Sequence, residues 1–310
     1  MGARRYALIG PGAVGLLYGG RLAAAGHELH VVGRSDVEHL RTRGMQLESA
    51  YGDVSLDTVS AFTDVRDVPP VDVVLVALKT TANHLLPELL APFAGQGTTI
   101  VMLQNGLGVE ERAARAAPGA TVLGGLCFVC ALKVGPGHAR HVDYGAITVA
   151  EHDASAITEA VSAVADDLEA AGVEAKREAD LFAARWRKLV WNIPYNGLSV
   201  LLDAGTDELM ADTATRALVV DLMNEVADGA RACGRQLPDG FVEQMLEMTD
   251  AMVPYRTSMK TDYDAGYPLE LGAIYGAPVK TAASAGCRMQ RVEMVWRALQ
   301  FLDSRRNSGS

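Results

Sequence analysis

The sequence predicts an α/β domain at the N-terminus followed by an all-α domain at the C-terminus. The chain has 310 residues, of which 49% are hydrophobic and 21% are charged, so it can bury two separate cores. In the first half, short apolar runs alternate with helical stretches, which is the pattern of parallel strands joined by crossover helices. In the second half, long amphipathic stretches follow one another. These observations place the two domains at residues 1–177 and 178–310.

Five short apolar runs predict the strands of the first domain. They are residues 6–9, 28–32, 71–78, 98–103 and 121–130. The run 71–78 (VDVVLVAL) is apolar almost throughout, as a strand buried on both faces should be, so we expect it in the middle of the sheet. Helical periodicity fills the intervals at 14–25, 81–92 and 108–117.

Two further elements complete the first domain. Residues 138–142 and 146–150 can pair as a β-hairpin across residues 143–145. A helix over 155–171 should end at Gly172, because glycine is common just past the C-terminus of a helix.

The second domain is predicted from its helical periodicity alone. Its amphipathic stretches lie at 179–201, 206–233, 239–253 and 288–303.

The composition argues against several classes of partner. The net charge of −10 and the pI near 5.2 speak against nucleic acid or an anionic membrane, because neutralising phosphates requires clustered Lys and Arg. No apolar run approaches the roughly 20 residues of a membrane span, and the N-terminus leads into a strand without a signal-peptide core, so we expect a cytoplasmic protein. Cys127 and Cys130 lie in a predicted strand, where residues three apart point to opposite faces, so we predict core cysteines and no metal site.

A glycine-rich turn follows the first predicted strand. It contains Gly10, Pro11, Gly12, Ala13, Val14 and Gly15, a G-x-G-x-x-G motif between a strand and a helix. Gly10 allows a tight turn, Gly12 lets the backbone approach a pyrophosphate, and Gly15 lets the helix pack closely on the strand. The N-terminus of the helix presents unpaired N–H groups to the anion. We therefore predict a Rossmann-type dinucleotide-binding domain in preference to an incidental glycine turn.

The end of the second predicted strand indicates which nicotinamide cofactor binds. An NAD site would carry Asp or Glu there to bind the ribose 2′-hydroxyl. This sequence carries Arg34, whose charge and planar fork of donors suit a 2′-phosphate, so NADPH is predicted. Two alternatives stay open: Arg34 is a solvated loop residue, or the nearby Asp36 offsets its charge.

Polar residues follow two further strands. Lys79 ends the third apolar run, and Gln104, Asn105 and Gly106 end the fourth. Ligands of open α/β sheets gather beyond the C-terminal ends of the strands, so we expect Lys79 and Asn105 near the nicotinamide end of the cofactor. The alternative is a surface lysine and a turn asparagine.

One stretch of the second domain places a lysine and two amides on a single helix face. Lys188, Asn192 and Asn196 recur every four residues among apolar side chains, whereas a solvated stripe would usually be richer in charge. Pro194 lacks an N–H and should kink the helix or end it locally. Further on, Glu270 opens an apolar helical stretch, where its plain alternative role is a first-turn carboxylate favoured by the helix dipole.

Together these pieces resemble the ketopantoate reductase family over essentially the whole chain. The matching pieces are the glycine turn at 10–15, Lys79, Gln104-Asn105-Gly106, the Lys188/Asn192/Asn196 run, Ser258-Met259 with Asp262, and Glu270. The resemblance implies a Rossmann domain joined to an all-helical domain, with the active site in the cleft between them. It also implies NADPH as hydride donor, a small 2-keto acid such as 2-dehydropantoate (ketopantoate) as acceptor, and a place in pantothenate biosynthesis. A homodimer is an assembly that the resemblance leaves open.

The resemblance also implies a role for each matching residue. Lys188 is the expected general acid, with Glu270 as its catalytic partner. The expected substrate-binding residues are Asn105, Asn192, Asn196, Ser258 and Lys79. The expected cofactor-binding residues are Gly10, Gly12, Ala13, Val14, Gly15, Arg34, Lys79 and Asn105. Two features depart from the family pattern: Pro194 interrupts the asparagine run, and residues 285–290 lack the proline that many relatives carry before their last helix.

The chemistry of a ketone reduction agrees with this assignment. Hydride delivery develops an alkoxide, so the site needs a cationic or hydrogen-bonding group at that oxygen and a proton to complete the alcohol. Lys188 can supply both. Two other functions stay open: another two-domain NAD(P)-dependent dehydrogenase, of the opine or β-hydroxyacid type, and a non-catalytic NADPH-binding regulator.

Overall fold

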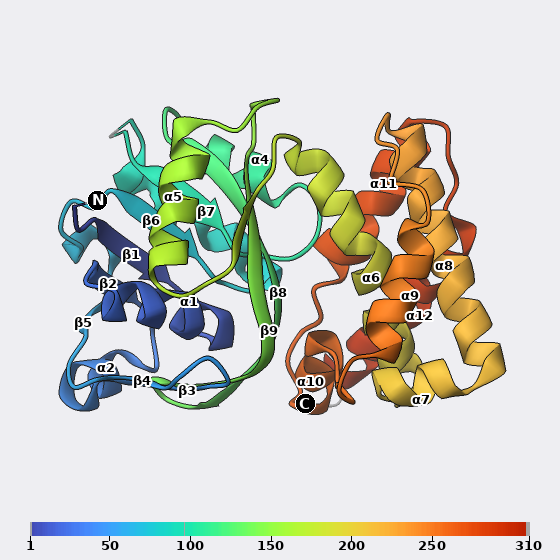
Figure 1. Ribbon diagram of the computed structural model, residues 1–310, viewed down its shortest axis with the longest axis horizontal. Helices are drawn as coiled ribbons and strands as arrows, with labels where there is room; N and C mark the ends of the chain where they lie inside the picture. The colour runs from blue at the N-terminus through green and yellow to red at the C-terminus, as the bar shows by residue number, and fades with distance from the viewer. Residues whose placement is uncertain (1, 96, 308–310) are drawn as a thin grey trace. The chain divides into compact units, whose positions relative to one another are not determined.

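The structure is a computed structural model that describes residues 2–95 and 97–307. The chain divides into two compact units, each drawn in Figure 1. The first comprises Met1–Gln104 and Val109–Leu181, and the second comprises Asn105–Gly108 and Phe182–Ser310. All described strands belong to the first unit and the second is built from helices, so the predicted fold class is confirmed. The first unit ends at Leu181, four residues beyond the predicted boundary at 177–178, and the grouping of residues 105–108 with the helices was not predicted.

Among the described residues, ten strands form one sheet in the first unit. Their bounds are β1 Arg5–Ile9, β2 Glu28–Val32, β3 Met45–Ser49, β4 Val54–Leu56, β5 Ser60–Phe62, β6 Val73–Val76, β7 Thr99–Met102, β8 Thr121–Gly135, β9 His138–Glu151 and β10 Ala175–Arg177. The order across the sheet is β4-β3-β9-β8-β7-β6-β1-β2-β5, and β10 pairs with β9. The strands from β8 to β5 run parallel, so their C-terminal ends share one edge of the sheet.

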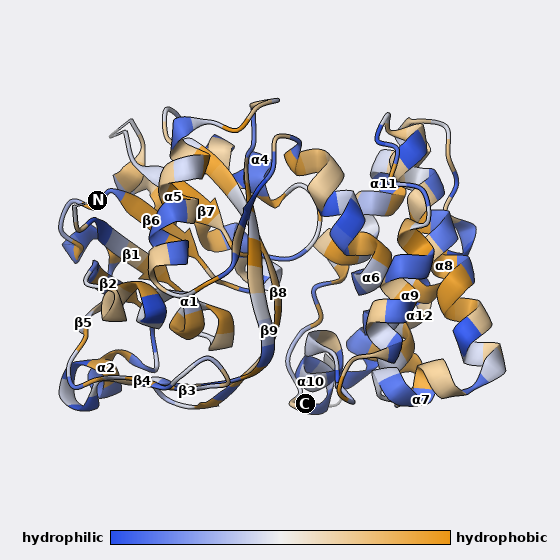
Figure 2. Ribbon diagram, in the orientation of Figure 1, coloured by the Kyte–Doolittle hydropathy of each residue, from blue (hydrophilic) through white to orange (hydrophobic). Residues whose placement is uncertain are grey.

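The third predicted strand lies in the middle of the sheet, as expected. β6 pairs with β1 on one side and β7 on the other, and all four of its residues are buried. Figure 2 shows these central strands as mainly hydrophobic ribbon. The nearly continuous apolar run therefore reflects a strand that is buried on both faces.

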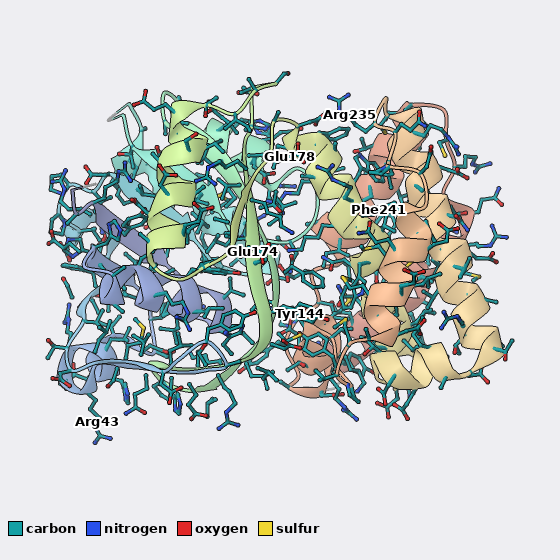
Figure 3. All side chains as sticks on the ribbon, in the orientation of Figure 1. Arg43, Tyr144, Glu174, Glu178, Arg235 and Phe241 are labelled. Atoms are coloured by element: carbon teal, nitrogen blue, oxygen red, sulfur yellow. The ribbon has the colours of Figure 1, made fainter. Side chains whose placement is uncertain are left out.

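The predicted hairpin across residues 143–145 is wrong. β8 and β9 form one long antiparallel pair whose turn lies at residues 136–137. Residues 143–145 lie within β9, on which Figure 3 labels Tyr144. Tyr144 and Gly145 have φ angles of 59° and 127°, and the register shifts opposite them between Phe128 and Val129. An irregularity inside a strand uses the same residue types as a turn, which explains the error.

Several helices of the first unit lie where the sequence pattern predicts them. They are α1 Ala13–Ala24, α2 Val37–Arg43, α3 Leu86–Leu90, α4 Val109–Ala116 and α5 Glu159–Ala170. The predicted helix at 81–92 is instead a short α3 between two 3₁₀ segments, Thr80–Leu85 and Ala91–Phe93. Gly172 follows α5 with a φ of 76°, as predicted for a C-terminal glycine.

The second unit packs its helices around a separate core. They are α6 Leu181–Leu202, α7 Thr206–Ala211, α8 Thr213–Ala232, α9 Phe241–Asp250, α10 Ser258–Asp264, α11 Ala277–Ser284 and α12 Gln290–Asn307. The stretch predicted as one helix at 206–233 is divided at Asp212, which takes an extended conformation and caps α8 by accepting hydrogen bonds from Ala214 and Thr215. A π-helical turn, Gly272–Gly276, precedes α11. None of the described helices is long and apolar enough to cross a membrane.

Candidate active site

The glycine turn joins β1 to α1 with almost no spare room around two of its glycines. Gly10 has a φ of 95°, and a Cβ there would lie 3.0 Å from the backbone nitrogen of Leu78. A Cβ at Gly15 would lie 2.5 Å from the carbonyl oxygen of Gly10. Around Gly12, in contrast, no heavy atom lies within 4 Å of the place a Cβ would occupy. The turn is therefore tight on the protein side and open beside Gly12.

The N-terminus of α1 suits an anion in that open space. Gly12 caps the helix without a side-chain hydrogen bond, and the first turn carries no acidic residue. The first intrahelical bond runs from the N–H of Leu16 to the carbonyl of Gly12 at 2.9 Å, so the N–H groups of Ala13, Val14 and Gly15 precede it. A pyrophosphate placed here would accept hydrogen bonds from those groups and interact favourably with the helix dipole. The residues present fit a dinucleotide.

Arg34 stands directly beyond β2 with an exposed side chain, and it makes no ion pair or hydrogen bond to any described residue. The nearby Asp36 is buried, and its carboxylate accepts hydrogen bonds from Lys133, Gly137 and Ser35. Asp36 therefore does not form an ion pair with Arg34, contrary to one alternative drawn from the sequence. The guanidinium of Arg34 is available to a ligand.

Gln104 fixes the loop that carries Lys79. Lys79 is exposed and precedes the 3₁₀ segment Thr80–Leu85. The buried Gln104 donates from Nε2 to the carbonyl oxygen of Leu78 at 2.9 Å and to Oδ1 of Asn83 at 2.7 Å. Gln104 thus holds the loops after two neighbouring strands together, a role that the sequence analysis missed.

Asn105 lies in a segment that follows β7 but packs with the second unit. The N–H of Leu107 donates to the carbonyl oxygen of Ala273 at 2.9 Å, and the Leu107 side chain belongs to the helical core. Gly106 has a φ of 96°, and a Cβ there would lie 2.5 Å from the backbone of Ala273, so only glycine fits. The segment holds Asn105 in the same unit as Glu270, which precedes Ala273 by three residues.

The lysine and the two amides lie on one face of α6, as their spacing predicts. The helix does not end at Pro194 but continues to Leu202, so Asn196 keeps its place on that face. Beside the proline, the buried Tyr275 donates its hydroxyl hydrogen to the carbonyl oxygen of Ile193 at 2.8 Å. This contact supports the helix where Pro194 contributes no hydrogen bond of its own.

Each of the two amide side chains on this face is buried and has one polar atom that forms no hydrogen bond with any described residue. Asn192 and Asn196 are 7% and 2% exposed. Nδ2 of Asn192, Oδ1 of Asn196 and Oδ1 of Asn105 have no hydrogen-bond partner among residues 2–95 and 97–307. A buried polar atom left in this state costs roughly 1–3 kcal/mol, so such atoms need an explanation in a native fold. A ligand that supplies the missing donors and acceptors is the simplest one.

Ser258 is positioned relative to this face by its neighbour Thr257. The side chain of Thr257 caps α10 by accepting a hydrogen bond from the N–H of Lys260. Its Oγ1 also lies 2.7 Å from Oγ of Ser199, which belongs to α6, and both hydroxyl groups are buried. The half-buried Ser258 therefore starts a helix that is fastened to α6.

A further lysine of this unit, the buried Lys260, has a structural role. Nζ of Lys260 forms ion pairs with Asp203, at 2.7 Å, and with Asp264. Burial lowers the pKa of Lys260, but hydrogen bonds and charge from the two carboxylates outweigh burial, so the pKa lies above its ordinary value. Lys260 is held in ion pairs at the end of α6, which leaves Lys188 as the ammonium on the amide face.

Glu270 is 6% exposed and lies two residues before the π-helical segment Gly272–Gly276. Its carbonyl oxygen accepts a hydrogen bond from the N–H of Ile274 at 3.2 Å, so the helical stretch predicted after Glu270 is present. A buried carboxylate at this position is more than a solvated first-turn residue.

Two family models match most of the chain. Residues 6–154 match the model described as ketopantoate reductase PanE/ApbA, and residues 180–303 match the model of its C-terminal part. The chain belongs to the ketopantoate reductase family.

Individual relatives agree with this membership. The 2-dehydropantoate 2-reductase of Nostoc sp. is 48% identical over 313 residues, which cover 100% of this chain and 98% of the relative. The crystal structure of 2-dehydropantoate 2-reductase from Geobacter metallireducens GS-15 is 40% identical with a TM-score of 0.92, covering 96% of this chain and 99% of that one. The ternary structure of D-mandelate dehydrogenase with NADH and anilino(oxo)acetate is 21% identical with a TM-score of 0.87, covering 98% and 99% of the two chains, and shares the fold.

Membership of the ketopantoate reductase family confirms the predicted class, an oxidoreductase with NADP as its cofactor. The residues matching the family pattern form two groups. The first unit holds Gly10, Gly12, Ala13, Val14, Gly15, Arg34 and Lys79; the second unit holds Asn105, Lys188, Asn192, Asn196, Ser258 and Glu270. Sequence reasoning assigned no supporting role to Gln104, Ser199 or Thr257. Gln104 alone carried a signal, its position beside Asn105 at a strand end.

Proposed function

We propose that this chain catalyses the NADPH-dependent reduction of 2-dehydropantoate to pantoate. The observation that carries the proposal is the face of α6, where one ammonium stands beside two buried amides whose hydrogen bonds are incomplete. 2-Dehydropantoate carries a carboxylate, a keto oxygen and a hydroxyl group, so it offers the acceptors and the donor that these side chains lack. The family to which the chain belongs makes this keto acid the first substrate to test.

In this proposal the first unit binds most of the cofactor and the second unit binds the keto acid. The glycine turn and the N-terminus of α1 hold the pyrophosphate of the cofactor, and Arg34 binds the 2′-phosphate. Lys79 and Asn105 assist at the nicotinamide end. When bound, NADPH supplies a hydride to the keto carbon.

The second unit binds the keto acid and completes the alcohol. Lys188 donates a proton from Nζ to the keto oxygen as the new C–H bond forms, and the resulting neutral amine regains its proton from water. Before transfer, the positive charge of Lys188 stabilises the negative charge that develops on this oxygen. Glu270 orients the ammonium, and Asn105, Asn192, Asn196 and Ser258 hold the remaining substrate oxygens, so that one face of the ketone meets the donor.

Three finer statements belong to the same proposal. We assign the enzyme to pantothenate biosynthesis on the basis of its proposed product, and we assign it to the cytoplasm. The predicted partners are this keto acid and, in a homodimer, a second copy of the chain, without nucleic acid or membrane. Light scattering of the purified protein would measure the assembly.

The test is NADPH oxidation by the purified protein, followed by absorbance, with 2-dehydropantoate, pyruvate and a branched 2-keto acid. We expect the highest kcat/KM for 2-dehydropantoate, and a lower one when NADH replaces NADPH. A higher value for another keto acid would reassign the substrate and favour a different dehydrogenase of this fold. Tight NADPH binding without oxidation by any keto acid would indicate a regulator instead.

A further inference from the structure

A buried carboxylate lies two residues beyond the arginine proposed to bind the 2′-phosphate. Asp36 is 2% exposed, whereas Arg34 and Ser35 before it are exposed. Asp and Glu near the end of the second strand are the residues with which such folds bind the ribose 2′-hydroxyl of NAD. This carboxylate therefore needs an explanation in a chain whose cofactor carries a phosphate there.

The carboxylate of Asp36 is bound by a lysine from a distant part of the chain. Lys133 Nζ lies 2.9 Å from Oδ1 and 2.7 Å from Oδ2 of Asp36. The N–H of Gly137, in the turn after β8, donates to Oδ2 at 3.0 Å, and the hydroxyl of Ser35 donates to Oδ1 at 2.9 Å. Among the residues that the structure describes, Asp36 is the single ion-pair partner of Lys133.

The β8–β9 turn and α2 are packed closely enough to keep this pair in place. A Cβ at Gly137 would lie 2.8 Å from the ring of His39 and 2.9 Å from the carbonyl oxygen of Gly44, so the turn packs against α2 and the residue that follows it. The carbonyl oxygen of Gly137 also accepts a hydrogen bond from the N–H of Gln46 at 2.9 Å. The Lys133–Asp36 pair is thus a fixed junction between the hairpin and the loop that carries Arg34.

The junction changes the charge seen by a ligand at Arg34. Burial raises the pKa of Asp36, but the hydrogen bonds from Lys133, Gly137 and Ser35 outweigh burial, so the pKa lies below its ordinary value and the carboxylate is ionised at neutral pH. A phosphomonoester carries about −1.5 to −2 charges at pH 7, so an unneutralised carboxylate nearby would repel it. Lys133 removes that repulsion.

We propose that Lys133 is a specificity-determining residue for the 2′-phosphate of NADPH. Because Lys133 neutralises the negative charge of Asp36, the positive charge of Arg34 is not offset. Lys133 thereby sets the preference for NADPH over NADH. The inference rests on the cofactor part of the proposed function and on none of its substrate chemistry.

The test uses three variants that change the net charge of the Lys133–Asp36 pair in defined ways. Relative to the wild type, Lys133→Met removes one positive charge, Asp36→Asn removes one negative charge, and the double variant restores the sum. The measured quantity is the ratio of the Kd values for NADH and NADPH, from nucleotide fluorescence at low ionic strength. We expect K133M to lower this ratio about tenfold, the change that 1.4 kcal/mol produces. We expect D36N to raise it, and the double variant to return it to the wild-type value.

Arg43 supplies the matched control. It lies at the other end of α2, is exposed, and points away from the sheet in Figure 3. Arg43→Met removes the same charge without touching Asp36, so it should leave the ratio unchanged. If K133M does not fold, the comparison of D36N with the double variant tests the same charge difference.

Several outcomes would overturn the inference. They are a K133M ratio equal to that of the wild type, a double variant as impaired as K133M, and an R43M ratio that falls as far as that of K133M. Failure of the proposed function is distinguishable, because a protein that prefers NADPH but reduces no 2-keto acid leaves the binding ratios measurable. A wild type that binds both nucleotides equally would contradict this inference and leave keto-acid reduction untouched.

Discussion

At the scale of single residues, the second unit keeps polar groups where burial is costly. Asn192 and Asn196 lie on α6 with incomplete hydrogen bonding, while Lys260 in the same unit is paired with two carboxylates. A fold selected for stability alone would pair or replace the amides, so their retention points to a ligand. The same contrast separates the proposed proton donor, Lys188, from the structural lysine.

Lys188→Ala should lower kcat by roughly 100-fold or more, because general acid catalysis contributes about 10²–10⁴-fold. The Kd for NADPH should stay within about twofold of the wild type, since all the proposed cofactor contacts except Asn105 lie in the other unit. Stopped-flow turnover and fluorescence titration measure the two quantities. Lys188→Arg is the companion variant: it keeps the charge but releases a proton poorly at neutral pH, so kcat should stay low. Wild-type kcat in either variant would remove Lys188 from the mechanism.

Asn196→Leu should raise the free energy of unfolding by about 1 kcal/mol, because an apolar side chain of similar size removes a buried polar atom without a partner. The same change should lower kcat/KM for 2-dehydropantoate. Urea denaturation and steady-state kinetics measure the two effects. Asn224→Leu, at an exposed position of α8, is the control and should change neither. A destabilised N196L protein would show that the amide makes hydrogen bonds important to the fold.

At the scale of elements, hydrophobic patterns predicted the bounds of strands and helices well. Single turn-forming or helix-breaking residues predicted turns and helix ends poorly. β2 matches its predicted bounds, and α1 differs by one residue at each end, because burial on one or both faces dictates those patterns. The hairpin placed at residues 143–145 failed because turn residues also serve strand irregularities. Pro194 suggested a kink or an end to a helix that continues, supported from outside by Tyr275. A contact between residues so far apart in the chain cannot be predicted from the sequence around Pro194.

A buried histidine joins β3 to the irregular part of β9. Nε2 of His141 lies 2.6 Å from the carbonyl oxygen of Tyr144 and therefore carries the hydrogen, while Nδ1 lies 2.8 Å from Oγ of Ser49 and accepts. Ser49 Oγ also accepts a hydrogen bond from Arg21 at 2.7 Å. Burial, aided by the charge of Arg21, lowers the pKa of His141 against the opposing effect of the Tyr144 carbonyl. The neutral ring is the folded form.

The stability of the protein should fall as the pH drops below about 6.5, the ordinary pKa of histidine. Because the pKa of folded His141 is lower, the unfolded chain binds the extra proton first, and the stabilisation present above 6.5 is lost as the pH falls through the folded pKa. Urea midpoints at pH 7 and pH 5 measure the change. His141→Gln should reduce this dependence, whereas His84→Gln, at an exposed position, should follow the wild type. An equal dependence in H141Q would assign the effect to other groups.

At the scale of the whole molecule, the chain enters the helical unit twice. Asn105–Gly108 joins that unit between β7 and α4, and the chain returns for good at Phe182. Leu103 packs in the core of the sheet and Leu107, four residues later, packs in the core of the helices. A single loop therefore contributes to both cores.

Leu107→Ala should destabilise the helical unit and Leu103→Ala the sheet, each by about 2–5 kcal/mol, the usual cost of this truncation in a core. Hydrogen exchange followed by mass spectrometry separates the two effects. L107A should speed exchange in α6 and α11, and L103A in β7 and β8. Faster exchange in the same peptides for both variants would show that the two cores unfold together.

The candidate site was predictable to the extent that its residues follow one another in a pattern. The glycine turn and the Lys188/Asn192/Asn196 run have local spacings with a physical meaning, so the sequence alone singled them out. Lys133 and Asp36 meet only because a hairpin turn packs on α2, and no periodicity links positions so far apart. The sequence likewise could not show that the amides are buried without partners.

The double entry of the chain limits how this protein could be recombined with a homologue. A crossover at Leu181 would exchange the helical half but leave Gly106 and Leu107 behind, seated on an Ala273 inherited from the other parent. In such a chimaera, residues 105–108 would come from one parent and the helical core against which they pack would come from the other. Grafts that move residues 105–108 together with the C-terminal half should tolerate exchange better than grafts cut at the visible boundary.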